Sequence, residues 1–249
     1  MKISVVTVCF NSEATIAHTI RSFLEQTHAD KEMIVVDGRS GDLTLDIVRS
    51  FRNPDIRIYS EPDEGIYDAM NKGLGLYRGD AVGFLNSDDT FHDPHVLDSI
   101  AAGLADADAV YGDVMFVSDH AQKRAVRIWK AGAFRRGCFR QGWLPPHPTF
   151  YIRRGLATAV GPFDRRYGLS ADYDYMLRAL EVESPRVRYL PRILVDFMYG
   201  GSTTNSVMRY VTGNLLCLRS RQKHLRAPPV DLALLLKPLR KIHQFRWRP

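Results

Sequence analysis

The stretch Asp80-Ala81-Val82-Gly83-Phe84-Leu85-Asn86-Ser87-Asp88-Asp89 decides both the fold class and the place of a candidate site. Its short apolar run, bounded by polar residues, is typical of a buried strand in a parallel sheet. Asp88 and Asp89 close the run at the carboxyl end of the strand, where ligands of open α/β sheets bind. Adjacent carboxylates repel each other unless a cation joins them, and Mg²⁺ and Mn²⁺ bind through such oxygens together with substrate phosphates. The alternative is a pair of solvated loop acids, one of which caps a helix.

Three earlier segments show the same alternation of a buried strand with an amphipathic helix. The predicted strands are 3–8, 33–37 and 56–59, and the predicted helices are 16–24, 42–51 and 66–77, the first of them capped by Asn11 or Ser12. With the strand before Asp88 this makes four βα units. Such alternation predicts a doubly wound, mostly parallel α/β sheet with helices on both faces.

The pattern changes after residue 93. Asp93-Pro94 predicts the start of a helix that ends near Leu104. Further along we expect a strand, turn and strand in 109–117, strands at 125–129 and 149–152, an irregular functional loop at 130–148, and a helix that opens at about residue 170.

Composition places the chain among soluble globular proteins. It has 249 residues, of which 45% are hydrophobic and 25% charged, enough for one sizeable α/β domain. Three widely separated cysteines, Cys9, Cys138 and Cys217, argue against a disulfide framework or a zinc site and favour a reducing compartment. The start of the chain is typical of a first strand rather than a secretory signal, and its uncharged apolar stretches are too short to span a bilayer. We therefore expect a cytoplasmic protein.

The positive charge is concentrated at the end of the chain. Residues 207–249 hold ten Lys and Arg against Asp231 alone, a net charge of +9, so that the overall +6 leaves −3 for residues 1–206. Leucines at 232, 235, 236 and 239 recur at helical spacing there, and Pro238 is expected to divide this helix into two pieces. A basic amphipathic tail of this kind favours an anionic membrane surface or nucleic acid as partner, although packing on the body of the protein is a serious alternative.

Dinucleotide and phosphate-loop proteins are disfavoured. A Rossmann site needs Gly-x-Gly-x-x-Gly after the first strand, and the loop here is Cys9-Phe10-Asn11-Ser12-Glu13, without glycine. A Walker loop is absent, and the basic, Gly-rich loop of sugar nucleotidyltransferases is replaced by this acidic one. Asp37, at the end of the second strand, remains placed to bind a ribose or a base, or else to cap a helix.

Two later positions carry open alternatives. His147, in the Pro-rich loop, is either a structural histidine or a donor to a phosphate or a metal. Asp172 and Asp174 lie in the first turn of the last predicted helix, where they either complement the helix dipole or supply a general base.

Four segments in order resemble those of bacterial family 2 glycosyltransferases, most closely the branch that builds exopolysaccharides and other lipid-linked surface glycans. They are Val-Thr-Val-Cys-Phe-Asn-Ser-Glu (6–13), Ile-Val-Val-Asp-Gly-Arg-Ser-Gly-Asp (34–42), Glu-Pro-Asp-Glu-Gly-Ile-Tyr-Asp-Ala-Met-Asn-Lys-Gly (61–73) and Phe-Leu-Asn-Ser-Asp-Asp (84–89). The resemblance extends over about residues 1–200. It implies a GT-A fold, a nucleotide-sugar donor (UDP- more than GDP-), a Mn²⁺ or Mg²⁺ cofactor, and transfer with inversion to a glycan or polyprenyl-linked acceptor.

The resemblance also assigns expected site residues. Those expected around the donor are Thr7, Cys9, Asn11, Glu13, Asp37, Asp63, Asn71, Lys72, Asn86 and Ser87. Asn86-Ser87-Asp88 matches the family's Asp-x-Asp, which makes Asp88 the expected metal ligand, with Asp89 and His147 as further metal candidates. Ala171-Asp172 matches its Glu-Asp pair, which makes Asp172 the expected catalytic base.

Three departures from the family pattern bear on these roles. Asn86 is an uncharged replacement for the first Asp, Ala171 removes the usual neighbour of the base, and Asp37-Gly38 stands where Asp-Asp is common. We expect a catalytic domain over 1–206, with a nucleotide-binding half (1–104) and an acceptor half (105–206), and a basic extension over 207–249. We also expect the protein to be peripheral on the inner face of the cell membrane. The competing classes are a nucleotide-sugar or glycan-binding module without turnover and, with less support, a nucleic-acid-binding protein.

Overall fold

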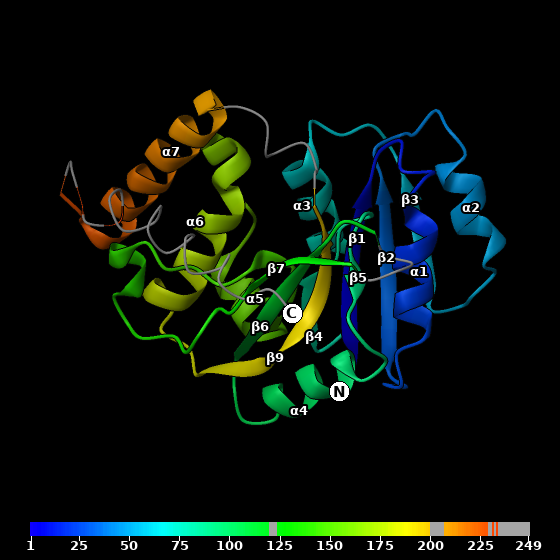
Figure 1. Cartoon of the computed structure of the whole chain (residues 1–249), viewed down its shortest axis with the longest axis horizontal. Coiled ribbons are helices and arrows are strands. Elements are labelled where there is room, and N and C mark those ends of the chain that lie inside the picture. Colours follow the sequence, from blue (N-terminus) through cyan, green and yellow to red (C-terminus); the bar gives the residue numbers. More distant parts are fainter. Residues whose placement is uncertain (120–123, 200–206, 229–230, 232, 234–249) are drawn as a thin grey trace.

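A single curled sheet runs through the molecule, with helices against both of its faces (Figure 1). The computed structural model describes residues 1–119, 124–199, 207–228, 231 and 233. Within these residues the sheet has nine strands in the order β3-β2-β1-β4-β8-β6-β9-β5, and β7 pairs with β6. This confirms the predicted α/β class.

The first half of the sheet is parallel, as predicted. β1 (Ile3–Cys9) pairs with β2 (Lys31–Asp37) and β4 (Ala81–Phe84), and β2 pairs with β3 (Ile56–Ser60). The crossover helices are α1 (Ile16–Leu24), α2 (Thr44–Ser50) and α3 (Ile66–Leu76). β1 and β2 are buried along their whole length, in keeping with the β-branched residues that predominate in β1 and in the middle of β2. The predicted side-chain cap of α1 is wrong, because the helix begins at Ile16, after a turn closed on the Ser12 carbonyl.

The second half of the sheet is mixed. It contains β5 (Thr90–Phe91), β6 (Ala109–Val117), β7 (Ala125–Trp129), β8 (Tyr151–Arg153) and β9 (Val187–Met198), with α4 (Val96–Leu104) and α5 (Arg154–Val160) beside it. β8 joins β4 to β6 in antiparallel pairings, whereas β6 and β9 run parallel. The predicted turn inside 109–117 is wrong. β6 continues through Gly112, where a Cβ would lie 2.6 Å from Leu194, and the register shifts instead.

The last described elements are helical. The loop 130–148 contains only the short turn η1 (Cys138–Gln141) and the beginning of η2 (His147–Thr149). η3 (Arg165–Ser170) leads into α6 (Ala171–Leu177), which continues as the π-helical turn η4 (Arg178–Val182). α7 (Val207–Leu225) lies alongside α6 (Figure 1). Among the described helices, none is both long and apolar enough to cross a membrane.

Two hydrophobic cores occupy the two faces of the sheet. Alternate residues of β1 divide between them: Val5 packs with α1, α2 and α4, while Val6 packs with α3, α5 and α6. Because the sheet is held from both sides, the loops at the carboxyl ends of β1, β2, β3 and β4 are left along one edge.

Candidate active site

Asp37 forms the centre of the carboxyl edge of the sheet. Its fully buried carboxylate accepts hydrogen bonds from the Ser40 backbone N–H (3.1 and 3.3 Å) and from the Ser60 hydroxyl (2.6 Å). The Cys9 thiol lies 3.7 Å from the same group, and burial, reinforced by Asp37, raises the pKa of Cys9 far above its usual range. Cys9 is therefore a protonated wall residue, and Asp37 ties together the ends of β1, β2 and β3.

The loops after β1 and β2 are bonded to each other. The Asn11 N–H donates to the Ser40 hydroxyl and its side-chain oxygen accepts from the Gly41 N–H, each at 2.9 Å. Glu13 accepts from the Leu43 N–H at 3.0 Å. Asn11 has φ 48°, a left-handed conformation that asparagine tolerates better than most residues. Asn11 and Glu13, which we expect to bind the sugar donor, thus hold the loops after β1 and β2 together.

The segment Asn86-Ser87-Asp88 lies next to these loops. The Ser87 hydroxyl is 2.9 Å from the Ser12 hydroxyl, which joins the end of β4 to the loop after β1. The side-chain oxygen of Asn86 is buried and, within the described part of the chain, has no hydrogen-bond partner. The hydroxyl of Thr7, in β1, is likewise buried and unpaired among the described residues.

Asp89 is hydrogen-bonded within the protein interior. Its fully buried carboxylate accepts from the Met198 N–H (3.3 Å) and from the Asn86 amide (3.1 Å). Burial, and then the charge of Asp88, raise the pKa of Asp89 well above its usual range. The structure therefore uses Asp89 to hold the Asn86–Asp88 turn, and the half-buried Asp88 is the carboxylate at the edge.

Three segments converge on Asp172, the second residue of α6. Its carboxylate accepts from the Tyr173 N–H at 2.7 Å. Burial and then the charge of Asp172 raise the pKa of Tyr67, on α3, well above its usual range. Burial lowers the pKa of His147, and the charge of Asp172 opposes this shift. The His147 ring stacks on Phe84, the last residue of β4, with centroids 5.4 Å apart, so the base candidate and β4 share one neighbour.

Sequence reasoning did not single out Tyr67, although it lies inside the quoted 61–73 segment. Its position on α3 was visible, but its proximity to Asp172, 105 positions along the chain, depends on tertiary packing. His147, by contrast, was a candidate, and the structure places it on the Asp172 side of the site.

The other residues that we expect around the nucleotide-sugar donor make contacts within the protein. The Asn71 amide brackets the Phe163 backbone, accepting from its N–H at 2.7 Å and donating to its carbonyl at 3.0 Å. Lys72 donates to the Pro62 carbonyl (2.6 Å) and pairs with Glu61 (3.0 Å). Asp63 covers Gly38, since a Cβ at residue 38 would lie 2.4 Å from its carboxylate.

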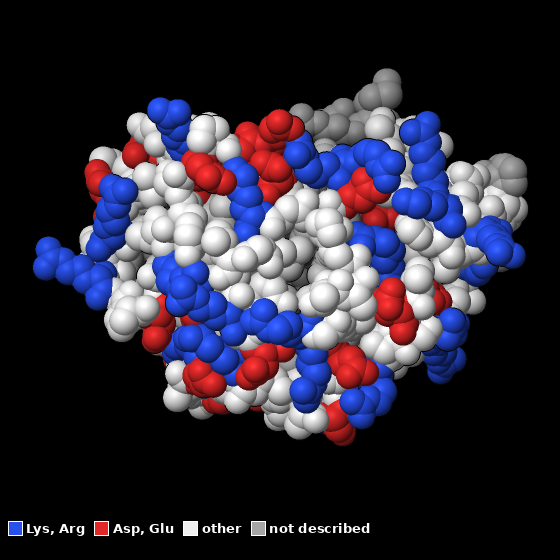
Figure 2. Space-filling model, turned by 180° about the vertical axis from the view of Figure 1, so that it is seen from behind, with Lys and Arg blue, Asp and Glu red and all other residues white. Residues whose placement is uncertain are grey.

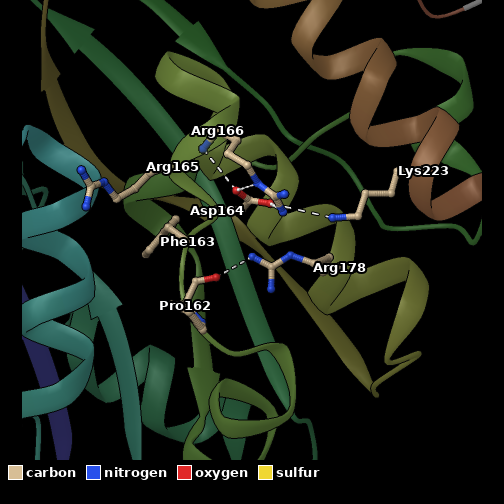
Figure 3. A pocket seen from close by; sticks show the side chains of 7 residues that line it. All are labelled: Pro162, Phe163, Asp164, Arg165, Arg166, Arg178 and Lys223. Carbon is tan, nitrogen blue, oxygen red and sulfur yellow. Dashed lines mark hydrogen bonds and ion pairs between the residues drawn. The ribbon is translucent and has the colours of Figure 1, made fainter.

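A cleft of about 420 Å³, which the sequence did not predict, lies beside α6 (Figure 3). Its lining residues are Pro162, Phe163, Asp164, Arg165, Arg166, Arg178 and Lys223. Arg166 binds Asp164 with two hydrogen bonds (2.7 and 2.8 Å), and these, with Lys223, lower the pKa of Asp164 to about 2. Arg178 pairs with Asp174, and Arg165 with Glu64 and Asp68. The cations are thus matched by acids, and the cleft is a junction that ties α3, α6 and α7 together.

The family model described as "Glycosyl transferase family 2" matches residues 4–164. The chain is a family 2 glycosyltransferase. The match covers all of the carboxyl-edge loops and ends before Asp172, so that the family assignment and the proposed base rest on different parts of the chain.

Two curated relatives of this glycosyltransferase are named for biosynthesis, one of PGL/p-HBAD and one of teichuronic acid. A "PGL/p-HBAD biosynthesis glycosyltransferase" of Mycobacterium tuberculosis is 31% identical over 213 residues, which cover 82% of this chain and 80% of that one. "Putative teichuronic acid biosynthesis glycosyltransferase TuaG" of Bacillus subtilis is 41% identical over 90 residues, 35% of this chain and 36% of that one.

Solved structures support the GT-A fold. S. aureus TarS 1–349 in complex with UDP-GlcNAc superposes with a TM-score of 0.69 at 19% identity, covering 99% of this chain and 74% of that one. Mannosyltransferase PcManGT from Pyrobaculum calidifontis, in complex with GDP-Man and Mn²⁺, gives 0.66 at 18% identity, covering 98% and 69%. At these identities the likeness shows the fold alone, and it confirms the expected GT-A architecture.

Proposed function

We propose that this glycosyltransferase moves a sugar from a nucleoside-diphosphate sugar, UDP- more than GDP-, to a hydroxyl of a glycan or lipid-linked acceptor, with inversion. The observation that carries the proposal is that Phe84 adjoins both the candidate cation ligands and a neighbour of the candidate base. Asn86 and Asp88 follow Phe84 in the turn after β4, and His147, which stacks on it, is near enough to Asp172 for the charge of that carboxylate to act on its pKa. A leaving-group site and a proton-accepting site therefore share one edge. The names of the two curated relatives support the acceptor class.

The oxygens at the end of β4 fit a divalent cation. The unpaired, buried oxygen of Asn86 and the carboxylate of Asp88 are hard ligands of the kind that Mg²⁺ and Mn²⁺ take. The described residues contain no cluster of three or more His, Cys, Asp or Glu side chains that could hold a metal by themselves. This agrees with a cation bound by one or two protein groups and completed by donor phosphates. We assign this role to Asp88 and Asn86 and leave Asp89 to its structural hydrogen bonds.

The proposed reaction needs one group of the protein that accepts a proton. Such a cation would supply positive charge that stabilises the departing nucleoside diphosphate. The acceptor oxygen forms a bond to the anomeric carbon as the bond from that carbon to the phosphate oxygen breaks, and Asp172 takes the acceptor proton. Burial lowers the pKa of His147, which favours a neutral ring near Asp172.

The test separates the two sites. A thermal-shift panel of nucleotide sugars with Mn²⁺ identifies the donor, because ligands that bind the native state raise its stability. With that donor, Asp172→Asn should lower kcat by about 10²-fold or more while donor affinity stays nearly unchanged. Asp88→Ala should abolish metal-dependent transfer and weaken donor binding, and Asp46→Asn, an exposed acid on α2, should change neither. Full activity of Asp88→Ala, or of the unaltered protein in excess EDTA, would refute the metal role. Donor binding with no release of nucleoside diphosphate would instead favour the binding module.

The chain's basic end supports a second part of the proposal, a place on the anionic inner face of the cell membrane. Leu232 and residues 234–249, which carry most of the predicted amphipathic pattern, lie outside the described residues. Basic and acidic side chains are intermingled over the face shown in Figure 2, in keeping with the −3 charge of residues 1–206 against +9 for residues 207–249.

Liposome sedimentation tests the membrane part. Each basic residue at an anionic surface contributes on the order of 1 kcal/mol, less at high salt. We expect the protein to sediment with anionic vesicles at low salt and to be released by deletion of 234–249. The deletion starts there because Asp231 is paired in the fold. Indifference of the whole protein to anionic vesicles would dismiss the membrane role.

A further inference from the structure

α7 holds the start of the helix that carries Asp172. The Ser170 hydroxyl, two residues before it, donates to the Gly213 carbonyl at 3.1 Å. The Ser220 hydroxyl donates to the buried Asp174 carboxylate, two residues after it, at 2.8 Å. The residues on either side of the proposed base are thus bonded to one helix, which lies outside the part of the chain that the family model matches.

Arg221 is the centre of this contact. Its side chain is only 1% exposed, although it is charged and sits on a helix at the molecular periphery. Two of its nitrogens bind the Asp231 carboxylate at 2.5 and 2.9 Å, and a third donates to the Tyr173 hydroxyl at 2.9 Å. A buried guanidinium is tolerated only when it is paired and hydrogen-bonded in this way. Arg221 thereby links Asp231 to Tyr173 of α6.

Tyr173 connects this ion pair to Asp172. Its hydroxyl accepts from Arg221, and its backbone N–H donates to the Asp172 carboxylate at 2.7 Å. Its ring is fixed against Phe139, with centroids 5.4 Å apart. A movement of Tyr173 therefore moves the donor that orients the Asp172 carboxylate.

We infer that Arg221 is a positioning residue for Asp172, acting through Tyr173, and that α7 and Asp231 are a working part of the active site. The inference rests on the proposed role of Asp172. Its physical basis is that proton transfer requires a base held within hydrogen-bond reach of the acceptor, and a displacement of about 1 Å can cost on the order of 10²-fold in rate.

The chain contains a matched control for this arrangement. Arg57, on β3, donates to the Glu32 carboxylate at 3.1 Å and also to the Tyr59 hydroxyl. This set has the same composition, an arginine shared by a carboxylate and a tyrosine, and its arginine lies on the edge strand of the parallel half. Loss of the Arg57 hydrogen bonds affects stability through the same kind of contact but leaves the contacts of α6 unchanged.

The experiment compares Tyr173→Phe and Arg221→Lys with Tyr59→Phe and Arg57→Lys. The measurements are kcat for transfer from the donor found in the panel, its pH profile, and the affinity for UDP with Mn²⁺. We expect kcat to fall about tenfold for Tyr173→Phe and up to about 10²-fold for Arg221→Lys, with UDP affinity unchanged and the acidic limb of the profile displaced. The control variants should keep the kcat and the profile of the unaltered protein.

Two results would overturn the inference. One is that the variants of Tyr173 and Arg221 have the same kcat and pH profile as the variants of Tyr59 and Arg57. The other is a fall in kcat that is matched by a fall in UDP affinity with no displacement of the pH profile, which is what a merely structural role predicts. Tyr173→Phe keeps the ring contact with Phe139, so this arm is interpretable even if Arg221→Lys does not fold. If Asp172→Asn itself transfers normally, the proposed base is wrong. If Asp172→Asn is inactive and Tyr173→Phe matches Tyr59→Phe, only the inference fails.

Discussion

Gly38→Ala should weaken nucleotide binding without unfolding the protein. A Cβ at residue 38 would lie 2.4 Å from the Asp63 carboxylate oxygen, whereas ordinary contacts begin at 3.4 Å. The carboxylate must therefore retreat by about 1 Å, the difference of these distances. The backbone at Gly38 does not need glycine for its conformation, because residue 38 is not among those with positive φ. The substitution thus acts through Asp63.

The size of the effect follows from the contacts of Asp63. Its other oxygen accepts from the Gly65 N–H at 2.8 Å, and losing that hydrogen bond costs about 0.5–1.5 kcal/mol of stability. If Asp63 also accepts from the nucleotide, as the family resemblance implies, the lost hydrogen bond to a charged group is worth about 1.5–3 kcal/mol. That corresponds to roughly 10- to 100-fold weaker binding of UDP.

Gly41→Ala is the matched control, in the same loop. Its Cβ would meet nothing within 4 Å, and its N–H still donates to Asn11. Calorimetric titration of UDP with Mn²⁺ should show Gly41→Ala within about twofold of the unaltered protein. In an Asp63→Ala background, Gly38→Ala should have no further effect, because the two share one contact. Unchanged affinity for UDP in Gly38→Ala would refute the reasoning.

Two further predictions concern stability. Gly83→Ala, whose Cβ would lie 2.3 Å from the buried ring of Tyr151, should lower the free energy of unfolding by about 1–3 kcal/mol, whereas Gly155→Ala, on α5 with open space around it, should raise it by up to about 1 kcal/mol. Urea unfolding measures both, and a neutral Gly83→Ala would mean that the β4–β8 contact is looser than described. Because the pKa of Asp164 is lowered to about 2, its stabilising contribution is complete above the unfolded value of about 4 and is lost as the pH falls from 4 to 2. Asp164→Asn should flatten the unfolding free energy over this interval, and an unchanged slope would exclude Arg166 and Lys223 as its partners.

Much of the parallel half of the sheet could be predicted from the sequence, because the patterns of its strands and helices are local. Strands buried on both faces are rich in apolar residues, and the crossover helices have apolar residues at helical spacing. The predicted strands 3–8 and 33–37 therefore fall within the observed β1 (3–9) and β2 (31–37), and the apolar run before Asp88 contains β4 (81–84). The mixed half was harder. The continuity of β6 through Gly112 depends on the close approach of Leu194, which is contributed by a strand 82 residues away.

In the candidate site, too, some features were determined by the sequence and others only by the tertiary structure. Sequence alone determined that carboxylates stand at the end of β4 and in the first turn of α6, because motif and periodicity are local. Which carboxylate of each pair is fully buried, Asp89 in one and Asp174 in the other, was decided only by tertiary structure. Asp89 is taken inward by the Met198 N–H, and Asp174 by Arg178 and by Ser220 of α7. A buried carboxylate needs donors to offset its lost hydration, and two of these donors, Met198 and Ser220, come from distant segments that only the folded chain brings within reach.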